Sequence, residues 1–399
     1  MVSVTEAADI IFSNLYNPSV EDVPLQQSAN RVLAEIIKAD RDFPGFDRVS
    51  MDGIAIQYQS WKAGKKEFPV EFVQAAGSPQ SRLASPLNCA EVMTGAVLPE
   101  NTDTVIKYED LKVGSNRARV LSESVEPGQN IHRQGIDCRE NEVLLEPGIL
   151  LSPAEVALLA SVGKINVDVF ALPRTAIISS GDELVDVKEI PQPHQIRRSN
   201  TYAIEAAMQS LNWKGTHFHF PDNKSILLKS LQTLLQDHEV LILSGGVSKG
   251  KFDFIPEVFE ELGIKKLFHH VNQRPGKPFW FGSSGQGKTV FALPGNPVST
   301  YMCFYRYVKP WILRSLGVNV PELTASLVKD FSFSPNLTYF LQVAVSSEQG
   351  KLLAYPEAGG GSGDFVNLKN VTGFLQLPPD QSNFKAGQVF PYIPFRHYV

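Results

Sequence analysis

The sequence EVLILSGGVSKGKFDF, residues 239–254, joins a short apolar run to a glycine turn that carries polar side chains. The run at its start has the length and apolar content of a buried strand. Two more glycine turns follow it, RPGKP at 274–278 and LPGNPVS at 293–299. Glycines let backbone N–H groups approach oxyanions closely, and the positive end of a following helix favours negative charge. The three turns therefore predict a site for a phosphorylated, anionic small molecule.

Strands and helices alternate around this stretch. The predicted strands are RTAIISS, THFHF, EVLIL and TVFAL, at 174–180, 216–220, 239–243 and 289–293. The predicted helices cover 199–211, 223–236, 254–262 and 297–316. This alternation implies a parallel sheet covered by helices on both faces, and so an α/β fold. Ligands of such sheets bind beyond the carboxyl ends of the strands, where the predicted polar loops lie.

Carboxylates gather at these strand ends. Asp182, Glu183, Asp222 and Asp253 each stand at or just beyond one of them. A converging set could hold Mg²⁺, which prefers oxygen ligands and is often shared with substrate phosphates. The alternative is that Asp222 and Asp253 cap the helices that follow them. Because the set lies beside glycine turns, we favour the metal-binding interpretation.

Two cations in the second glycine turn, Arg274 and Lys277, suit an anionic ligand. Arginine binds oxyanions through two parallel hydrogen bonds, and lysine acts as a point charge on phosphate. Arg133 and Lys249 are outer candidates, and we interpret Lys249 as a solvated surface residue.

The flanking sequence predicts further modules. Ser3 and Glu6 form a capping box that opens a helix, and a second helix starts at 152 and stops at Gly163. Residues 43–56 read as irregular, whereas short runs from 70 to 125 predict a mainly β module. Short strands return from 320 to 399, and the glycine run at 359–363 reads as a loop within that β domain. The aromatic residues at 304, 305 and 307 are predicted to belong to the core.

Composition limits the class of protein. The 399 residues exceed one ordinary core, and 43% hydrophobic with 20% charged residues is a globular composition. A net charge of −5 argues against a nucleic-acid binder with a basic surface. Three scattered cysteines without a CxxC pair indicate a reducing compartment. With no signal peptide and no apolar run of ~20 residues, we expect a cytoplasmic protein without a membrane partner.

An ordered series of motifs resembles the molybdopterin molybdenumtransferase family, of the MoeA type to which the gephyrin E domain is related. The resemblance covers nearly the whole chain. The motifs are FDRVSMDGIAI at 46–56, EVMTGAVLP at 91–99, NIHRQGID at 130–137, SSGDEL at 179–184, RRSN at 197–200, the three glycine turns, and GGGSGDF at 359–365.

The resemblance implies an enzyme that inserts molybdate into adenylylated molybdopterin, releasing AMP and forming molybdenum cofactor, with Mg²⁺ assisting. It also implies a homodimer with active sites shared between subunits, and contact with the molybdopterin adenylyltransferase. Two alternative functions are the adenylyltransferase activity itself and a scaffold similar to gephyrin. The extra modules argue against the first, and the acidic set argues against the second.

The resemblance further assigns residues and domains. It implies catalytic roles for Asp52, Thr94 and Asp137, contributed across the dimer, and for the acidic residues Glu183, Asp222 and Asp253, which are also the predicted metal ligands. With the glycine turns, it assigns substrate binding to Arg133, Ser244, Gly245, Gly246, Ser248, Arg274, Gly276, Lys277, Pro294, Gly295, Asn296, Pro297, Ser299 and Ser362. The expected domains are an elongated dimerisation domain (1–22, 42–50, 137–172), a β-rich domain (23–41, 51–136), a molybdopterin-binding α/β domain (173–318) and a barrel-like C-terminal β domain (319–399).

Overall fold

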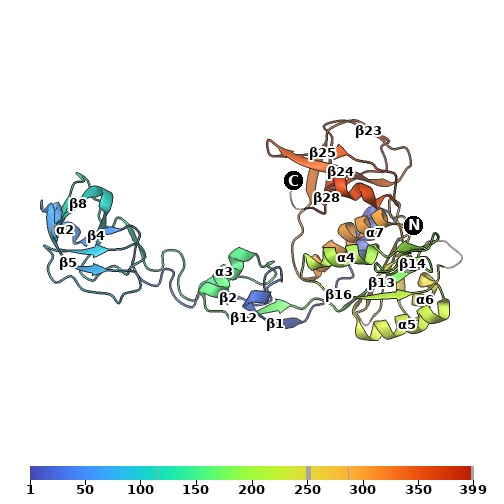
Figure 1. The fold of residues 1–399 in the computed structure, drawn as a ribbon, viewed down its shortest axis with the longest axis horizontal. Helices are drawn as coiled ribbons and strands as arrows, with labels where there is room; N and C mark the ends of the chain where they lie inside the picture. The colour runs from blue at the N-terminus through green and yellow to red at the C-terminus, as the bar shows by residue number, and fades with distance from the viewer. Residues whose placement is uncertain (115, 249–252, 286, 397–399) are drawn as a thin grey trace. The chain divides into compact units, whose positions relative to one another are not determined.

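The chain folds into two units in a computed structural model that describes residues 1–399 except 115, 249–252, 286 and 397–399 (Figure 1). The first unit contains Met1–Ala34, Pro147–Val156 and Asn166–Val399. The second contains Glu35–Glu146 and Ala157–Ile165. Residues 23–34, expected in the β-rich domain, thus lie with the first unit, and the finer division into four domains stays a prediction.

A six-stranded sheet with the order β16-β13-β17-β21-β20-β18 forms the centre of the first unit. The first four strands are mutually parallel, as the alternating pattern predicted, whereas β20 and β18 are antiparallel additions. These two strands are absent from the sequence-based expectation because they have only four and five residues and show no strict alternation of buried and exposed positions. The strands are β13 (Thr175–Ser180), β16 (Gly215–Phe220), β17 (Val240–Ser244), β18 (Lys265–His269), β20 (Trp280–Ser283) and β21 (Thr289–Leu293).

Helices cover both faces of this sheet, as expected. Alternate residues of a strand point to opposite faces, so Ile177 and Ile178 of β13 enter different cores. Ile177 packs with α1, α4, α7 and α8, and Ile178 packs with α5 and α6. The helices are α1 (Val4–Phe12), α4 (Asn200–Gln209), α5 (Lys224–Asp237), α6 (Ile255–Glu261), α7 (Pro297–Cys303) and α8 (Lys309–Ser315).

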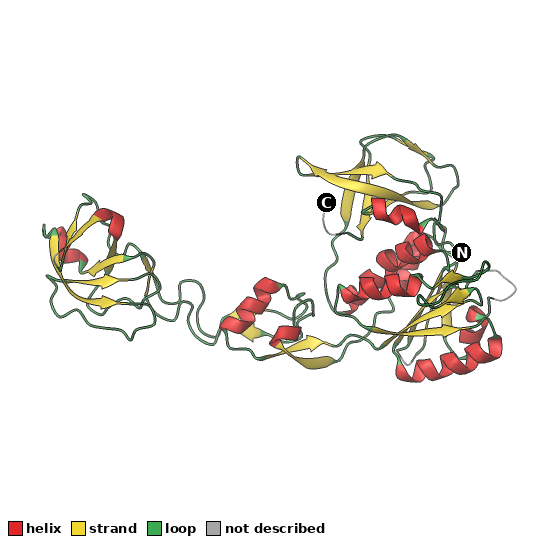
Figure 2. Ribbon diagram, in the orientation of Figure 1, coloured by secondary structure: helices red, strands yellow, loops and turns green. Residues whose placement is uncertain are grey.

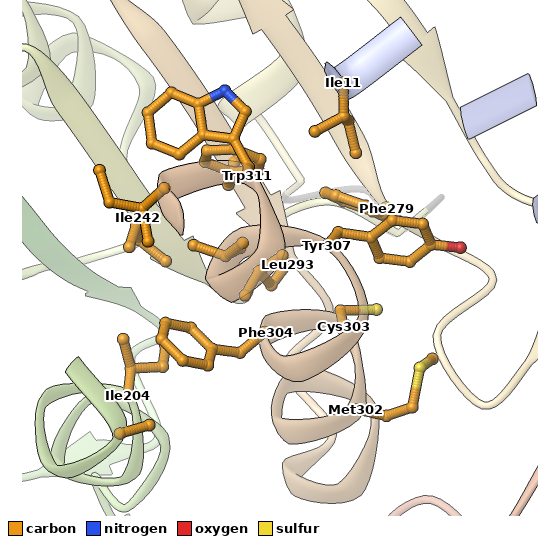
Figure 3. Packing of buried hydrophobic residues seen from close by; sticks show 14 of the residues in the cluster. Ile11, Ile204, Ile242, Phe279, Leu293, Met302, Cys303, Phe304, Tyr307 and Trp311 are labelled. Atoms are coloured by element: carbon orange, nitrogen blue, oxygen red, sulfur yellow. The ribbon is translucent and has the colours of Figure 1, made fainter. Parts of the chain in front are cut away.

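The larger of the two cores is aromatic (Figure 3). Phe304, Tyr307 and Trp311 are each at most 1% exposed and project from one continuous helical stretch. A π-helical segment, η3 (Phe304–Val308), joins α7 to α8 within this stretch. Phe304 and Tyr307 therefore belong to the core, as their spacing predicted.

Helix starts follow the expected capping chemistry. The Ser3 hydroxyl accepts from Glu6 N at 3.1 Å, and Glu6 Oε2 accepts from Ser3 N at 2.7 Å. The predicted capping box at Ser3 is confirmed. Helix α3 (Pro153–Ser161) begins similarly, since Ser152 N donates to the Glu155 carboxylate at 2.8 Å and the Ser152 hydroxyl accepts from Ala154 N at 3.2 Å.

The C-terminal strands form a closed barrel. The order β24-β25-β22-β28-β26 closes through pairing of β24 with β26, and β19 (Gln273–Arg274) extends the sheet beside β24. The glycine run at 359–363 lies between two of these strands, so it is a loop within the barrel domain as predicted. The barrel strands are β22 (Leu323–Leu327), β24 (Thr338–Glu348), β25 (Lys351–Pro356), β26 (Gly373–Leu377) and β28 (Val389–Pro394), with the short pair β23 (Phe331–Ser332) and β27 (Asn383–Phe384).

The second unit is mainly β, as predicted, with the strand order β7-β4-β6-β5-β9-β8 (Figure 2). The expectation that residues 43–56 are irregular is wrong at its end, because β4 is a buried strand between β7 and β6. Gly53 made this stretch look like a turn. A Cβ there would lie 1.9 Å from Ile106 O, so the glycine permits close strand packing. The strands are β4 (Gly53–Ile56), β5 (Glu67–Gln74), β6 (Cys89–Val92), β7 (Thr104–Lys107), β8 (Leu111–Gly114) and β9 (Arg117–Val120), with helix α2 (Tyr58–Lys62).

Short two-stranded pairs complete the chain. Within the first unit β1 (Val20–Pro24) pairs with β12 (Asn166–Phe170), and β14 (Leu184–Val185) pairs with β15 (Ile196–Arg197). Within the second unit β2 (Ile37–Lys38) pairs with β11 (Val143–Leu145), and β3 (Arg48–Val49) pairs with β10 (Ile131–His132). Across the described residues, no helix combines the length and apolar character needed to cross a bilayer.

Candidate active site

A cavity of about 840 Å³ opens at the carboxyl ends of the parallel strands. Residues that follow β13, β16, β17 and β21 all line it, which is the position expected for a ligand site in a parallel sheet. The predicted site residues that line it are Glu183, Asp222, Ser244, Gly245, Gly246, Ser248, Asp253, Pro294, Gly295, Asn296 and Pro297.

The first glycine turn packs directly on the neighbouring strand ends. Gly245 has a φ of +102°, and a Cβ at this position would lie 2.7 Å from Ser180 O. Its N–H donates to Leu293 O at 3.1 Å, which ties the turn to the end of β21. A side chain would therefore push the turn away from both neighbours.

A buried polar network joins the two turns that follow β17 and β21. Asn200 Nδ2, at the start of α4, donates to Ser244 Oγ at 2.8 Å and to Gly295 O at 2.7 Å. The Thr300 hydroxyl donates to Pro294 O, and Ser244 Oγ contacts the same carbonyl. The hydroxyl of Ser244 is thus engaged within the protein, and the network holds both turns in one arrangement. Asn200 and Thr300 carry no role in the sequence-based assignment, because only the fold brings them beside these turns.

Asp222 is not the helix cap. The residue after it, Asn223, caps α5 by accepting from Ser225 N at 3.1 Å and Ile226 N at 3.2 Å. The Asp222 carboxylate instead accepts from Ser180 Oγ at 2.5 Å and lines the cavity. At the next helix, the N-cap position of α6 is Phe254 rather than Asp253. The capping alternative is therefore wrong for Asp222.

The carboxylates suit Mg²⁺ by their chemistry and position but do not form a complete protein cage. Glu183, Asp222 and Asp253 all line the cavity. Among the described residues, no three His, Cys, Asp or Glu side chains lie close enough together to hold a metal ion. Mg²⁺ is commonly held by one or two carboxylates together with water and substrate phosphates. The donor set fits a magnesium ion of that kind, and its binding here stays a prediction.

The cations that line the cavity are not those of the second glycine turn. Arg274, Gly276 and Lys277 lie outside its lining, although the adjacent Pro278 belongs to it. The guanidinium of Arg274 lies 5.8 Å from the ring of Phe333, in the barrel domain. The cavity is lined instead by two consecutive arginines of the RRSN motif, Arg197 and Arg198. Paired arginines just before a helix start are the signal that could have identified them. Lys249 lies outside the described residues.

The glycine-rich loop of the barrel domain also reaches this cavity. Ser362 Oγ accepts from Asn296 Nδ2 at 2.9 Å, and Ser362 O accepts from Val298 N at 3.1 Å. Its neighbours Gly363 and Phe365 line the cavity. Ser299, in contrast, is 3% exposed and lies outside the lining.

Asp52 and Thr94, far apart in sequence, meet in the second unit. Asp52 Oδ1 accepts from Thr94 N at 2.6 Å. This hydrogen bond, followed by one from the Thr94 side chain, lowers the pKa of the Asp52 carboxyl. The motifs that contain Asp52 and Thr94 thus meet at one exposed anionic group, the carboxylate of Asp52.

The RQGID motif of the second unit makes one ion pair and one histidine–carboxylate contact. His132 Nε2 lies 2.8 Å from Asp137 Oδ2, and Arg133 Nη1 donates to Asp47 Oδ2 at 2.6 Å.

The cysteine after this motif, Cys138, has no role among the predicted site residues. Desolvation and the neighbouring Glu142 raise the pKa of its thiol, which favours the protonated form.

Comparison with known proteins covers the chain in three segments. Residues 2–163 match the MoeA N-terminal region (domain I and II), residues 176–314 match a probable molybdopterin binding domain, and residues 324–395 match the MoeA C-terminal region (domain IV).

Curated relatives share the full length. The chain is 40% identical over 396 residues to the molybdopterin molybdenumtransferase of a Synechocystis strain, covering 98% of this chain and 99% of the relative. It is 32% identical over 390 residues to the Bacillus subtilis protein of the same name, with coverage of 94% and 90%. A solved MoeA protein from Pyrococcus horikoshii aligns over 100% of both chains, with a TM-score of 0.82 and 29% identity. This chain therefore belongs to the MoeA family of molybdopterin molybdenumtransferases.

Proposed function

We propose that this protein is a molybdopterin molybdenumtransferase. It inserts molybdate into adenylylated molybdopterin, releases AMP and yields molybdenum cofactor. The observation that carries the proposal is the cavity at the strand ends, where glycine turns, carboxylates and arginines line one space of about 840 Å³. Full-length similarity to curated proteins of that name supports the choice of reaction.

The substrates set the electrostatic problem. Molybdate is a dianion near neutral pH, and adenylylated molybdopterin carries phosphates. Backbone N–H groups and cationic side chains must offset the repulsion between them. Arg197 and Arg198 line the cavity, and Arg274 and Lys277 remain predicted contributors from the second glycine turn. These groups would orient the phosphoanhydride, while the sulfur atoms of the substrate bind the incoming molybdenum.

We expect Mg²⁺ to be held by one or two of the carboxylates of Glu183, Asp222 and Asp253, with substrate phosphate oxygens as further ligands. When bound, it would supply charge neutralisation at the phosphoanhydride. Removal of divalent ions with EDTA should stop AMP release, and added Mg²⁺ should restore it. Unchanged AMP release after complete removal would contradict the magnesium assignment.

We also propose a homodimer in which the motifs around Asp52, Thr94, Asp137 and Arg133 complete the cavity of the other subunit. The family resemblance of those motifs supports this arrangement. We expect the protein to work in a reducing, cytoplasmic setting, and the free thiols of Cys89, Cys138 and Cys303 support a reducing one. Transfer of a reactive intermediate would favour contact with the adenylyltransferase that supplies the substrate.

The direct test mixes the purified protein with adenylylated molybdopterin, Mg²⁺ and molybdate. We expect AMP release together with reconstitution of a molybdenum-dependent apoenzyme. Asp52→Ala and Asp253→Ala variants that remain folded should lose both signals. Absence of both signals with the wild-type protein would refute the transferase proposal.

No observation favours either alternative activity. ATP consumption without dependence on molybdate would identify an adenylyltransferase. Cofactor synthesis that survives loss of Asp52 and Asp253 would show that the assigned site is wrong.

A further inference from the structure

The cavity carries three carboxylates, from Glu183, Asp222 and Asp253, although its proposed substrates are anions. Among the described lining residues the cations are Arg197 and Arg198. We propose that Arg198 is the cavity residue that holds a tetrahedral oxyanion of the substrates. This inference rests on the proposed function and deepens it by naming the group that positions the anion.

The backbone places Arg198 at the edge of the acidic loop. Strands β14 and β15 form a short parallel pair, in which Ile196 N donates to Glu183 O at 2.8 Å. Arg198 N donates to Val185 O at 3.0 Å. The arginine is therefore anchored to the same loop that brings Glu183 to the cavity.

The guanidinium of Arg198 is largely buried and incompletely paired. Its side chain is 16% exposed, and its Nη2 donates to the carboxylate of Asp186. Its Nε atom is buried and has no hydrogen-bond partner among the described residues. A guanidinium has five N–H donors, and a buried unsatisfied donor is unfavourable. An oxyanion in the cavity would accept from the remaining donors.

Arg197 differs from its neighbour in each respect. It is exposed, and its Nε donates to Glu189 O at 2.9 Å. The protein thus already satisfies the Nε of Arg197 but not that of Arg198. For this reason we assign the anion to Arg198.

The positive charge of Arg198 also acts on a neighbour of the cavity, His219. Burial, followed by the charge of Arg198, lowers the pKa of His219. The Nδ1 atom of His219 lies 3.0 Å from the hydroxyl of Ser179, which lines the cavity. Pairing with Asp186 therefore does not cancel the charge of Arg198 at this position.

The oxyanion has two possible sources, the phosphate of the adenylyl group and molybdate. Isothermal titration of the wild-type protein with AMP and, separately, with molybdate distinguishes them. For Arg198→Gln we expect the Kd of one or both ligands to rise about tenfold, the size of one lost charge-assisted hydrogen bond. Arg198→Lys keeps the charge but loses the fork, so we expect a smaller rise.

The competing role for Arg198 is to brace the β14–β15 pair through Asp186. Asp186→Asn is the matched control, since Asp186 lies outside the cavity lining and its replacement leaves the cation in place. We expect Asp186→Asn to bind the anion at least as tightly as wild type, with thermal unfolding confirming that both variants are folded. Wild-type affinity in Arg198→Gln, or equal weakening in Asp186→Asn, would overturn the inference.

Failure of the inference is distinguishable from failure of the proposed function. If the wild-type protein releases AMP from adenylylated molybdopterin but Arg198→Gln keeps its KM, only the role of Arg198 is refuted. If the wild-type protein releases no AMP, the transferase proposal fails whatever the titrations show.

Discussion

Asp52 illustrates how a single exposed carboxylate is kept ionised. Its partner is mainly a backbone N–H, that of Thr94, which persists whatever the pH. The resulting decrease in pKa favours the charged form.

The Asp52 contact has a defined pH dependence. Because the folded pKa lies below the ordinary value of 3.8, the contact stabilises the fold fully above that value. The contribution is lost as the pH falls through the lower folded pKa. We expect Asp52→Asn to reduce stability at neutral pH and to differ little from wild type in strong acid. Urea unfolding at several pH values measures this, and a penalty that does not change with pH would contradict it.

Gly53, the next residue, has a purely steric reason to be glycine. We expect Gly53→Ala to destabilise the protein by about 2 kcal/mol or more, because its Cβ would overlap the carbonyl of Ile106. Gly114→Ala, in the same sheet, is the control, since among the described residues its Cβ would meet nothing within 4 Å. Thermal unfolding compares the two variants. Equal stability would show that the Gly53 contact relaxes easily.

At the scale of elements, neighbouring residues between a strand end and a helix start have different roles, one in the site and one in the fold. At the junction of β16 and α5, Asn223 caps the helix while Asp222 turns its carboxylate to Ser180 and the cavity. A site residue and a folding residue thus stand side by side, which explains why helix capping by Asp222 was an alternative from the sequence.

Substitution of the cap tests this division. We expect Asn223→Ala to lower the free energy of unfolding by about 1 kcal/mol, because two N–H groups of α5 lose their acceptor. Asn223→Ser should retain most of the stability, since serine caps similarly. Chemical denaturation gives both values. A fully stable Asn223→Ala variant would show that another group caps α5.

At the scale of the whole molecule, the proposed shared site can be tested by subunit exchange. If one subunit supplies Asp52 and the other supplies Asp253, a mixed dimer of Asp52→Ala and Asp253→Ala chains contains one intact site. We expect two inactive homodimers, once exchanged, to recover about a quarter of wild-type AMP release, because half the dimers are mixed and each has one working site.

The control for subunit exchange uses two variants of the same cavity, Asp222→Ala and Asp253→Ala, both of which line it from one chain. This mixture should recover activity only if those two residues belong to different cavities. We therefore expect no recovery of AMP release. Recovery there, or none with the first pair, would show that the site is assembled differently.

Much of the fold was readable from local patterns. Alternating apolar runs and amphipathic helices predicted the parallel strands β13, β16, β17 and β21, because a buried strand and a helix each impose their own period on a short segment. β18 and β20 were missed because strands of five and four residues without a regular alternation of buried and exposed residues carry little of that period. Gly53 was interpreted as part of an irregular segment because the contact that explains it is not local. Its partner Ile106 lies 53 residues away in the sequence.

The residue types of the site were likewise present in the sequence, and the strand ends located Glu183, Asp222 and the two glycine turns that follow β17 and β21. Which side chains face one another was decided only by the tertiary structure. It joined Asn200 to the turn at Gly295, paired Asp52 with Thr94, and brought Arg198 rather than Arg274 to the cavity. Local sequence determines the elements because their periods are short-range, whereas these contacts depend on how distant segments pack.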